Sequence, residues 1–216
     1  PRRDSVRLVD TVVELCRTRL PEKMHIPAES IQVLTATRKG DTGTAALNRA
    51  LQAALNPAGA GRREKRFGDL VFREGDRVMQ TRNDYDVLWE REDGTAGAGI
   101  LGKILQIDPS GELISIAFDD RVATYTADML AELDMAYAMT VHKAQGSEYR
   151  AVVLCIGKAG PMLLTRSVLY TAITRAKSLL IIVGDESAAY HMIDNQTQTR
   201  RYSGLRARLC GECGAV

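Results

Sequence analysis

The chain has 216 residues, 45% hydrophobic and 26% charged, a composition typical of a soluble globular protein with one large or two small domains. No apolar run approaches the ~20 residues that a membrane-spanning helix needs, so a membrane-spanning protein is excluded. The net charge of +2 is unevenly distributed: residues 1–66 carry +6, residues 67–134 carry −9 and residues 135–216 carry +5. This pattern indicates a domain that binds an anion and is interrupted by an acidic insertion, although chance scatter over solvated faces stays open.

The start of the chain and its cysteines narrow the class of protein. The chain starts at Pro1 without an apolar leader, which we interpret as a cytoplasmic protein or an internal fragment. Cys16 and Cys155 lie in apolar runs and are expected in the core. Cys210 and Cys213 form a CxxC without a second pair or a nearby histidine, which favours an incidental tail over structural zinc. We therefore predict no metal site and no disulfide framework.

The first third predicts an α/β unit. Residues 5–20 have helical spacing of apolar side chains, with Ser5 as the expected N-cap. Residues 31–35 predict a buried strand, and residues 44–55 predict a helix that ends at Asn56. Strand, glycine-containing loop and helix in this order are typical of nucleotide-handling domains.

The middle third predicts a small β structure. Short runs rich in β-branched residues occupy 76–81, 103–108, 112–118 and 121–125, joined by tight turns. They predict an antiparallel five-stranded barrel, so the acidic charge belongs to a compact β insertion.

The last third returns to α/β character. Residues 151–156 and 178–184 predict strands buried on both faces of a parallel sheet, and residues 165–176 predict the helix that connects them. The predicted fold class is therefore α/β, a parallel sheet interrupted by an antiparallel β-barrel.

The segment GAGILGK, residues 97–103, satisfies G-x-G-x-x-G but does not predict a phosphate loop. Such a loop needs a following helix, whereas ILQID predicts a strand, and Ile104 stands where Walker A has Ser or Thr. We expect these glycines to shape turns of the barrel.

Two other segments predict a ligand site. TVHKAQGSE, residues 140–148, concentrates hydroxyl, imidazole and amine donors beside a buried strand, and such donors suit phosphate oxygens. Arg175 follows Thr171 by four residues, with Arg166 and Lys177 adding positive charge. An arginine near the ligand edge of a sheet stabilises charge on a transferring phosphoryl group, whereas taken alone it is more often an ordinary surface residue.

These segments also carry a resemblance. AYAMTVHKAQGSEYRAVVL and LLTRSVLYTAITRAKSLLIIVGD closely resemble motifs V and VI of superfamily 1 DNA helicases, in particular the RecD-like, exodeoxyribonuclease V alpha-subunit-like group. LTATRKGDTGTAALNRALQAALNP, GDRVMQTRNDYD and RRYSGLRARL are also similar to that group. The resemblance implies that residues 1–66 and 135–216 form the second RecA-like motor domain, with residues 67–134 as an inserted SH3-like barrel.

The resemblance also implies roles for single residues. Arg175 resembles the arginine finger, the catalytic contact to the γ-phosphate. Gly146 and Glu148 match positions near ATP, and Gln145 is placed to couple ATP to DNA. The residues that match DNA-contacting positions are Thr37, Arg38, Arg82, Asn83, Thr140 and His142.

The implied cofactors are ATP and Mg²⁺, and the implied partners are single-stranded DNA and an upstream motor domain of the same protein. Walker A and the magnesium-holding motif are expected on that upstream domain, so this chain alone is expected to be inactive as an ATPase. The segment 87–99 is longer than the short turn that the family has after the element similar to RNDYD. The net charge of −9 on the barrel makes it unsuited to be a main phosphate-binding surface, and we expect it to contact proteins instead.

The resemblance thus implies part of an ATP-dependent DNA helicase that moves 5′ to 3′ on single-stranded DNA. The helicase portion of a conjugative relaxase shares these motifs and stays open, as does a non-catalytic module that only recruits DNA or protein.

Overall fold

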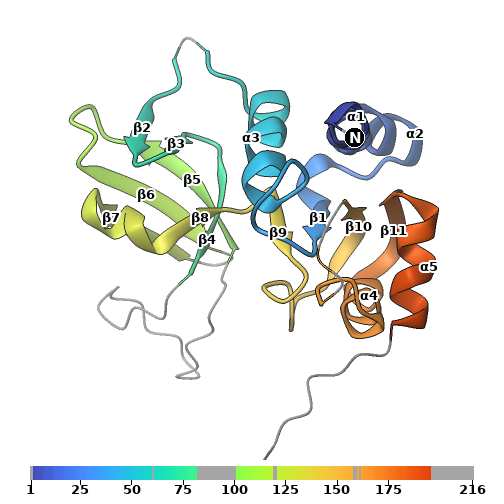
Figure 1. Cartoon of the computed structure of the whole chain (residues 1–216). Helices are drawn as coiled ribbons and strands as arrows, with labels where there is room; N and C mark the ends of the chain where they lie inside the picture. The colour runs from blue at the N-terminus through green and yellow to red at the C-terminus, as the bar shows by residue number, and fades with distance from the viewer. Residues whose placement is uncertain are drawn as a thin grey trace, which may run out of the picture.

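A four-stranded parallel sheet forms one half of the molecule (Figure 1). The computed structural model describes residues 2–59, 61–81, 101–118, 121–157, 160 and 162–195. The sheet has the order β11-β10-β1-β9, formed by Ala176–Gly184, Tyr149–Ile156, Ile31–Thr35 and Ala138–Thr140. Because β1 pairs with both β9 and β10, segments from before and after the middle third share one sheet.

Helices cover both faces of this sheet, and its central strands β1 and β10 are largely buried, whereas the edge strand β11 is half-buried or exposed over most of its length and not buried on both faces as predicted. One face packs against α1 (Arg2–Glu14), the π-helical turn η1 (Leu15–Arg19), α2 (Leu20–Met24) and α3 (Thr44–Leu55). The other face packs against α4 (Arg166–Ile173) and α5 (Glu186–Asp194). A short 3₁₀ turn, η2 (Ala28–Ser30), leads into β1.

The observed helices differ from the predicted ones in four details. The first helix begins at Arg2, so Ser5 lies inside it and is not its N-cap. It also continues beyond residue 20, through the π-helical turn η1 and then α2, whose first turn accommodates Pro21 because proline has no N–H to donate. The predicted helix at 165–176 ends at Ile173, and α5 has no counterpart among the predicted elements.

A five-stranded antiparallel sheet forms the other half, in the order β7-β6-β5-β4-β8. Its strands are Arg121–Thr126, Leu113–Phe118, Leu101–Ile107, Arg77–Gln80 and Leu133–Met135, with a 3₁₀ turn, η3 (Asp128–Glu132), between β7 and β8. A hairpin of β2 (Glu64–Phe67) and β3 (Leu70–Arg73) packs against the core of this sheet through Phe72. The predicted α/β class with an antiparallel insertion is confirmed.

The structure also bears on the remaining sequence motifs. Residues 101–107 form a strand, β5, which supports the rejection of a phosphate loop in GAGILGK; residues 97–100 lie outside the described residues. Cys16 and Cys155 are buried and free, as predicted, and burial raises the pKa of Cys16 to about 12 and that of Cys155 to about 11. The Cys210–Cys213 pair lies outside the described residues.

Two kinds of feature are absent from the residues that the structure describes. No helix there has the length and apolar character needed to cross a membrane. That part of the chain also contains no group of three or more His, Cys, Asp or Glu side chains arranged to hold a metal ion.

Candidate nucleotide and nucleic-acid sites

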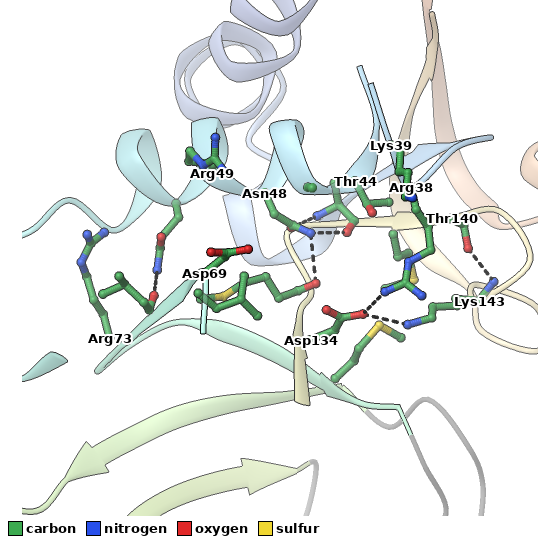
Figure 2. Close-up of a pocket in the computed structure, with 18 of the residues that line it drawn as sticks. Arg38, Lys39, Thr44, Asn48, Arg49, Asp69, Arg73, Asp134, Thr140 and Lys143 are labelled. Carbon is green, nitrogen blue, oxygen red and sulfur yellow. Dashed lines mark hydrogen bonds and ion pairs between the residues drawn. The ribbon is translucent and has the colours of Figure 1, made fainter. Parts of the chain in front are cut away.

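A cavity of about 650 Å³ lies at the junction of the two halves, bounded by α3, the β2–β3 hairpin and the β8–β9 connection (Figure 2). Its charged lining consists of six cations and two carboxylates: Arg38, Lys39, Arg49, Arg66, Arg73, Lys143, Asp69 and Asp134. We call this cavity the basic pocket. Its excess of cations, together with the hydroxyls of Thr44 and Thr140, matches what a phosphodiester backbone requires.

The loop after β1 brings two predicted DNA contacts to this region. The carbonyl of Thr37 accepts from the N–H of Thr44 at 3.1 Å, and the carbonyl of Arg38 accepts from the N–H of Ala45 at 3.4 Å. The loop thereby caps the first turn of α3 and holds the Arg38 side chain in the basic pocket, where it is 67% exposed. Thr37 itself does not belong to the pocket lining.

The end of β9 and the turn after it contain two more of the predicted DNA contacts, Thr140 and His142. Thr140, at the end of β9, lines the basic pocket, and its Oγ1 accepts from the N–H of Lys143 at 3.4 Å. His142 is exposed, and its carbonyl accepts from the N–H of Gln145 at 3.3 Å. The other two predicted DNA contacts, Arg82 and Asn83, lie outside the described residues.

The predicted nucleotide contacts gather at a different place, around Arg175. This residue lies in the turn between α4 and β11, and not on the helix as predicted. Its guanidinium donates to the carbonyl of Ser147 at 2.9 Å, to the carbonyl of Thr171 at 3.3 Å and to Oγ1 of Thr174 at 3.2 Å. Ser147 lies between Gly146 and Glu148, so the structure brings motif VI and motif V together.

The chemistry around Arg175 fits a phosphate group. Within the described residues the guanidinium bonds only to neutral oxygens, and these bonds use three of its five N–H groups. Gly146 has a φ of +91° and open space where a Cβ would stand. Glu148 forms an exposed ion pair with Lys177 at 3.5 Å. Arg175 therefore keeps donors and positive charge for an anion.

One short connection joins the basic pocket to the surroundings of Arg175. Since the four strands are parallel, the end of β9 lies at the carboxyl edge of the sheet and the start of β10 lies at the amino edge. Residues 141–148 cross between the edges, from Thr140 in the basic pocket to Glu148 beside Arg175. Gln145 is exposed in the middle of this connection.

Several residues of the basic pocket were not among the predicted contacts. Lys39 and Lys143 each stand beside a predicted residue, so their positions in the sequence were an available signal. Arg49 on α3 and Arg66 on β2 gave no such signal, because they reach the pocket only through the packing of the hairpin against α3.

Comparison with known proteins identifies the family. Residues 47–118 match the ATP-dependent RecD-like DNA helicase SH3 domain, and residues 135–183 match the UvrD-like helicase C-terminal domain. The ATP-dependent RecD2 DNA helicase of Deinococcus radiodurans is 38% identical over 159 residues, which is 74% of this chain and 21% of that protein. The chain belongs to the RecD-like DNA helicases.

Other RecD-like relatives share similar stretches. The RecBCD enzyme subunit RecD of Mycolicibacterium smegmatis is 31% identical over 179 residues, 82% of this chain and 29% of that protein. The chain thus spans between a fifth and a third of the length of these curated relatives.

Solved structures share the fold at low identity. A Pif1 helicase structure described as unwinding forked double-stranded DNA superimposes with a TM-score of 0.53 at 15% identity, covering 97% of this chain and 52% of that one. Bacteroides Pif1 in complex with ADP-AlF3 and single-stranded DNA gives a TM-score of 0.50 at 14% identity, covering 97% and 54%. The RecD-like chain therefore has the fold of one part of these helicases.

Proposed function

We propose that this RecD-like chain is the second motor domain of an ATP-dependent helicase that moves 5′ to 3′ along single-stranded DNA and unwinds duplex DNA. In this proposal the motor comprises residues 1–66 and 135–216, and the barrel comprises residues 67–134. The observation that carries it is the connection at 141–148, which runs from the basic pocket to the Arg175 cluster. In this proposal, a change at one end of the connection moves the backbone at the other end.

The basic pocket is the proposed contact with the DNA strand. Arg38 and Lys143 supply charge for the phosphates, and Thr140 supplies a hydroxyl, whereas the neighbouring Thr37 shapes the loop. His142 is exposed next to this pocket and is proposed as a further contact. The DNA contacts assigned to Arg82 and Asn83 stay predictions.

The Arg175 cluster is the proposed contact with ATP, whose hydrolysis supplies the free energy for movement. Arg175 donates to the terminal phosphate and stabilises the negative charge that develops there. In doing so it exchanges its bond to the Ser147 carbonyl, which releases the backbone between Gly146 and Glu148. The Mg²⁺ ligands are proposed on the first motor domain, together with Walker A.

Replacing Arg175 by Ala tests this proposal. In the complete helicase, kcat for ATP should fall by about 10³-fold or more, because the charge on the transferred phosphoryl group loses its cation. Affinity for an oligothymidylate, measured by fluorescence anisotropy, should change less than about twofold, since Arg175 lies outside the basic pocket lining.

Arg17→Ala is the matched control, because Arg17 is an exposed arginine in η1 on the helices that cover the other sheet face. It should keep both activities. An Arg175→Ala enzyme with unchanged ATP turnover would contradict the assignment.

The wider setting of the chain is also a proposal. The M. smegmatis relative is named as a subunit of the RecBCD enzyme, which supports a role in recombination or repair and a protein partner for the acidic barrel. A relaxase domain elsewhere in the same protein would instead favour the conjugative alternative, and a degenerate Walker A would favour the non-catalytic one. The cytoplasm stays the predicted location.

A further inference from the structure

We propose that Asp134 of the barrel competes with the DNA backbone for two cations of the basic pocket and so keeps the grip on the strand reversible. This inference rests on the proposed DNA-binding function and adds a regulating residue to it. Asp134 lies in β8, the strand that leads from the barrel back to the parallel sheet.

A single carboxylate oxygen of Asp134 holds both cations. Its Oδ2 is 3.2 Å from Nη2 of Arg38 and 3.0 Å from Nζ of Lys143 (Figure 2). Arg38 belongs to the loop after β1 and Lys143 to the turn after β9, so one barrel side chain bridges two loops at the carboxyl edge of the motor sheet. This is the arrangement in which a phosphate oxygen would receive the same two donors.

Exposure makes this bridge exchangeable. The side chains of Asp134, Arg38 and Lys143 are 33%, 67% and 31% exposed, and ion pairs with that much access to water contribute little to stability. A phosphodiester that approaches Arg38 and Lys143 can therefore replace the carboxylate at small cost. The carboxylate nevertheless stays close, and its repulsion weakens the bound strand.

The surrounding charges favour this role over a purely structural one. Two carboxylates, Asp69 and Asp134, face six cations in the basic pocket, and Asp134 is the one in contact with cations that the motor loops supply. The hairpin cation Arg73 has a different partner, Glu64. Asp134 thus reduces the positive charge at the point where loops of the parallel sheet meet the barrel.

Asp134→Asn in the full chain tests the inference, with a fluorescein-labelled oligothymidylate as the probe. Affinity at low salt should rise about three- to tenfold, because the competing charge is gone. The plot of log K against log salt should become steeper by about 0.7, the value for one additional effective phosphate contact on a single strand. A loss of fold alone would not steepen this slope.

Asp128→Asn is the matched control, since it removes the same charge from an exposed barrel residue that does not line the basic pocket. It should leave affinity and slope nearly unchanged. Asp134→Ser, a second neutral variant, should act in the same direction as Asp134→Asn. In an Arg38→Ala/Lys143→Ala background, Asp134→Asn should change affinity less than twofold, because the cations that it competes for are absent.

The outcomes separate the two proposals. If the wild-type chain binds the oligonucleotide and Asp134→Asn behaves like Asp128→Asn, the role of Asp134 is overturned and DNA binding by the pocket stands. If the complete wild-type helicase does not bind single-stranded DNA, both proposals are overturned.

Discussion

Asp76 is a buried carboxylate of the barrel side that accepts hydrogen bonds from the motor side. Its Oδ1 accepts from Asn56 at 2.7 Å and Tyr137 at 2.9 Å, and its Oδ2 accepts from Gln52 at 2.6 Å and from the N–H of Arg73 at 2.7 Å. Burial raises the pKa of Asp76 above 3.8, because removal from water penalises the charged form more than these donors stabilise it. This one residue therefore links α3, the hairpin and the segment between β8 and β9.

Asp76→Asn should lower the free energy of unfolding by about 1–3 kcal/mol, because the new amide N–H₂ faces two donors and cannot accept from them. Urea denaturation measures this loss, with Asp128→Asn as the exposed control.

The pH dependence gives a second measurement on the same variant. With a raised pKa, the folded chain holds a proton on Asp76 at pH values where the unfolded chain has lost it, so this contribution to stability falls as pH rises above 3.8. The stability difference between wild type and Asp76→Asn should therefore narrow as pH rises above about 4. A difference that widens over this range would contradict the assignment.

At the scale of elements, the loop between β1 and α3 depends on a close backbone approach at Gly43. A Cβ at this position would lie 2.6 Å from the carbonyl oxygens of both Arg38 and Lys39. The φ of Gly43 is −77°, so the requirement for glycine is steric and not conformational. The close approach involves the backbone of Arg38, whose side chain lines the basic pocket.

Gly43→Ala should destabilise the fold by about 1–3 kcal/mol, because a backbone that cannot give way must move. It should also weaken oligothymidylate binding several-fold, since Arg38 moves with the loop. Gly59→Ala is the control, because nothing lies within 4 Å of a Cβ there. Thermal unfolding and fluorescence anisotropy measure the two effects, and an unchanged affinity would show that the loop does not position Arg38.

Elements differ in how far the sequence predicts them, and burial explains the difference. The strand at 31–35 and the helix at 44–55 were predicted with their observed bounds, since the strand is a short buried run and the apolar side chains of the helix follow its period. Strand β8 has three residues and the β2–β3 hairpin is rich in charged side chains, so neither carries a clear period. The resemblance, and not periodicity, supplied the helicase motifs.

The residues of the candidate sites were likewise predictable only where a local sequence motif contains them. Thr140 and Arg175 were named from motifs, and the structure places them in the basic pocket and beside Ser147. Asp134 was not predicted to be involved, because its contact with Arg38 joins residues 96 positions apart. Pairings of that kind depend on how two halves pack, which local patterns do not encode.

At the scale of the whole molecule, Arg77 ties the barrel to the parallel sheet. It lies in β4, and its guanidinium donates to the carbonyl of Ile31 and to Oε1 of Gln32, each at 2.9 Å. Gln32 in turn donates to the carbonyls of Ala136 and Tyr137 at 3.3 and 3.2 Å. Burial lowers the pKa of Arg77 below its ordinary value. The basic pocket lies between the same two halves, although neither Arg77 nor Gln32 lines it.

Arg77→Met should therefore cost about 2–4 kcal/mol, since it leaves the Ile31 carbonyl and Gln32 Oε1 buried without this donor. The wild-type chain should unfold in one calorimetric transition, whereas the variant should show a broadened or divided one, because the two halves lose a shared constraint. Lys103→Met removes an exposed cation from the neighbouring strand β5 and should leave Tm and cooperativity unchanged. Equal calorimetric and van't Hoff enthalpies in Arg77→Met, at the wild-type Tm, would mean that the packing of Asp76 and α3 suffices to couple barrel and motor.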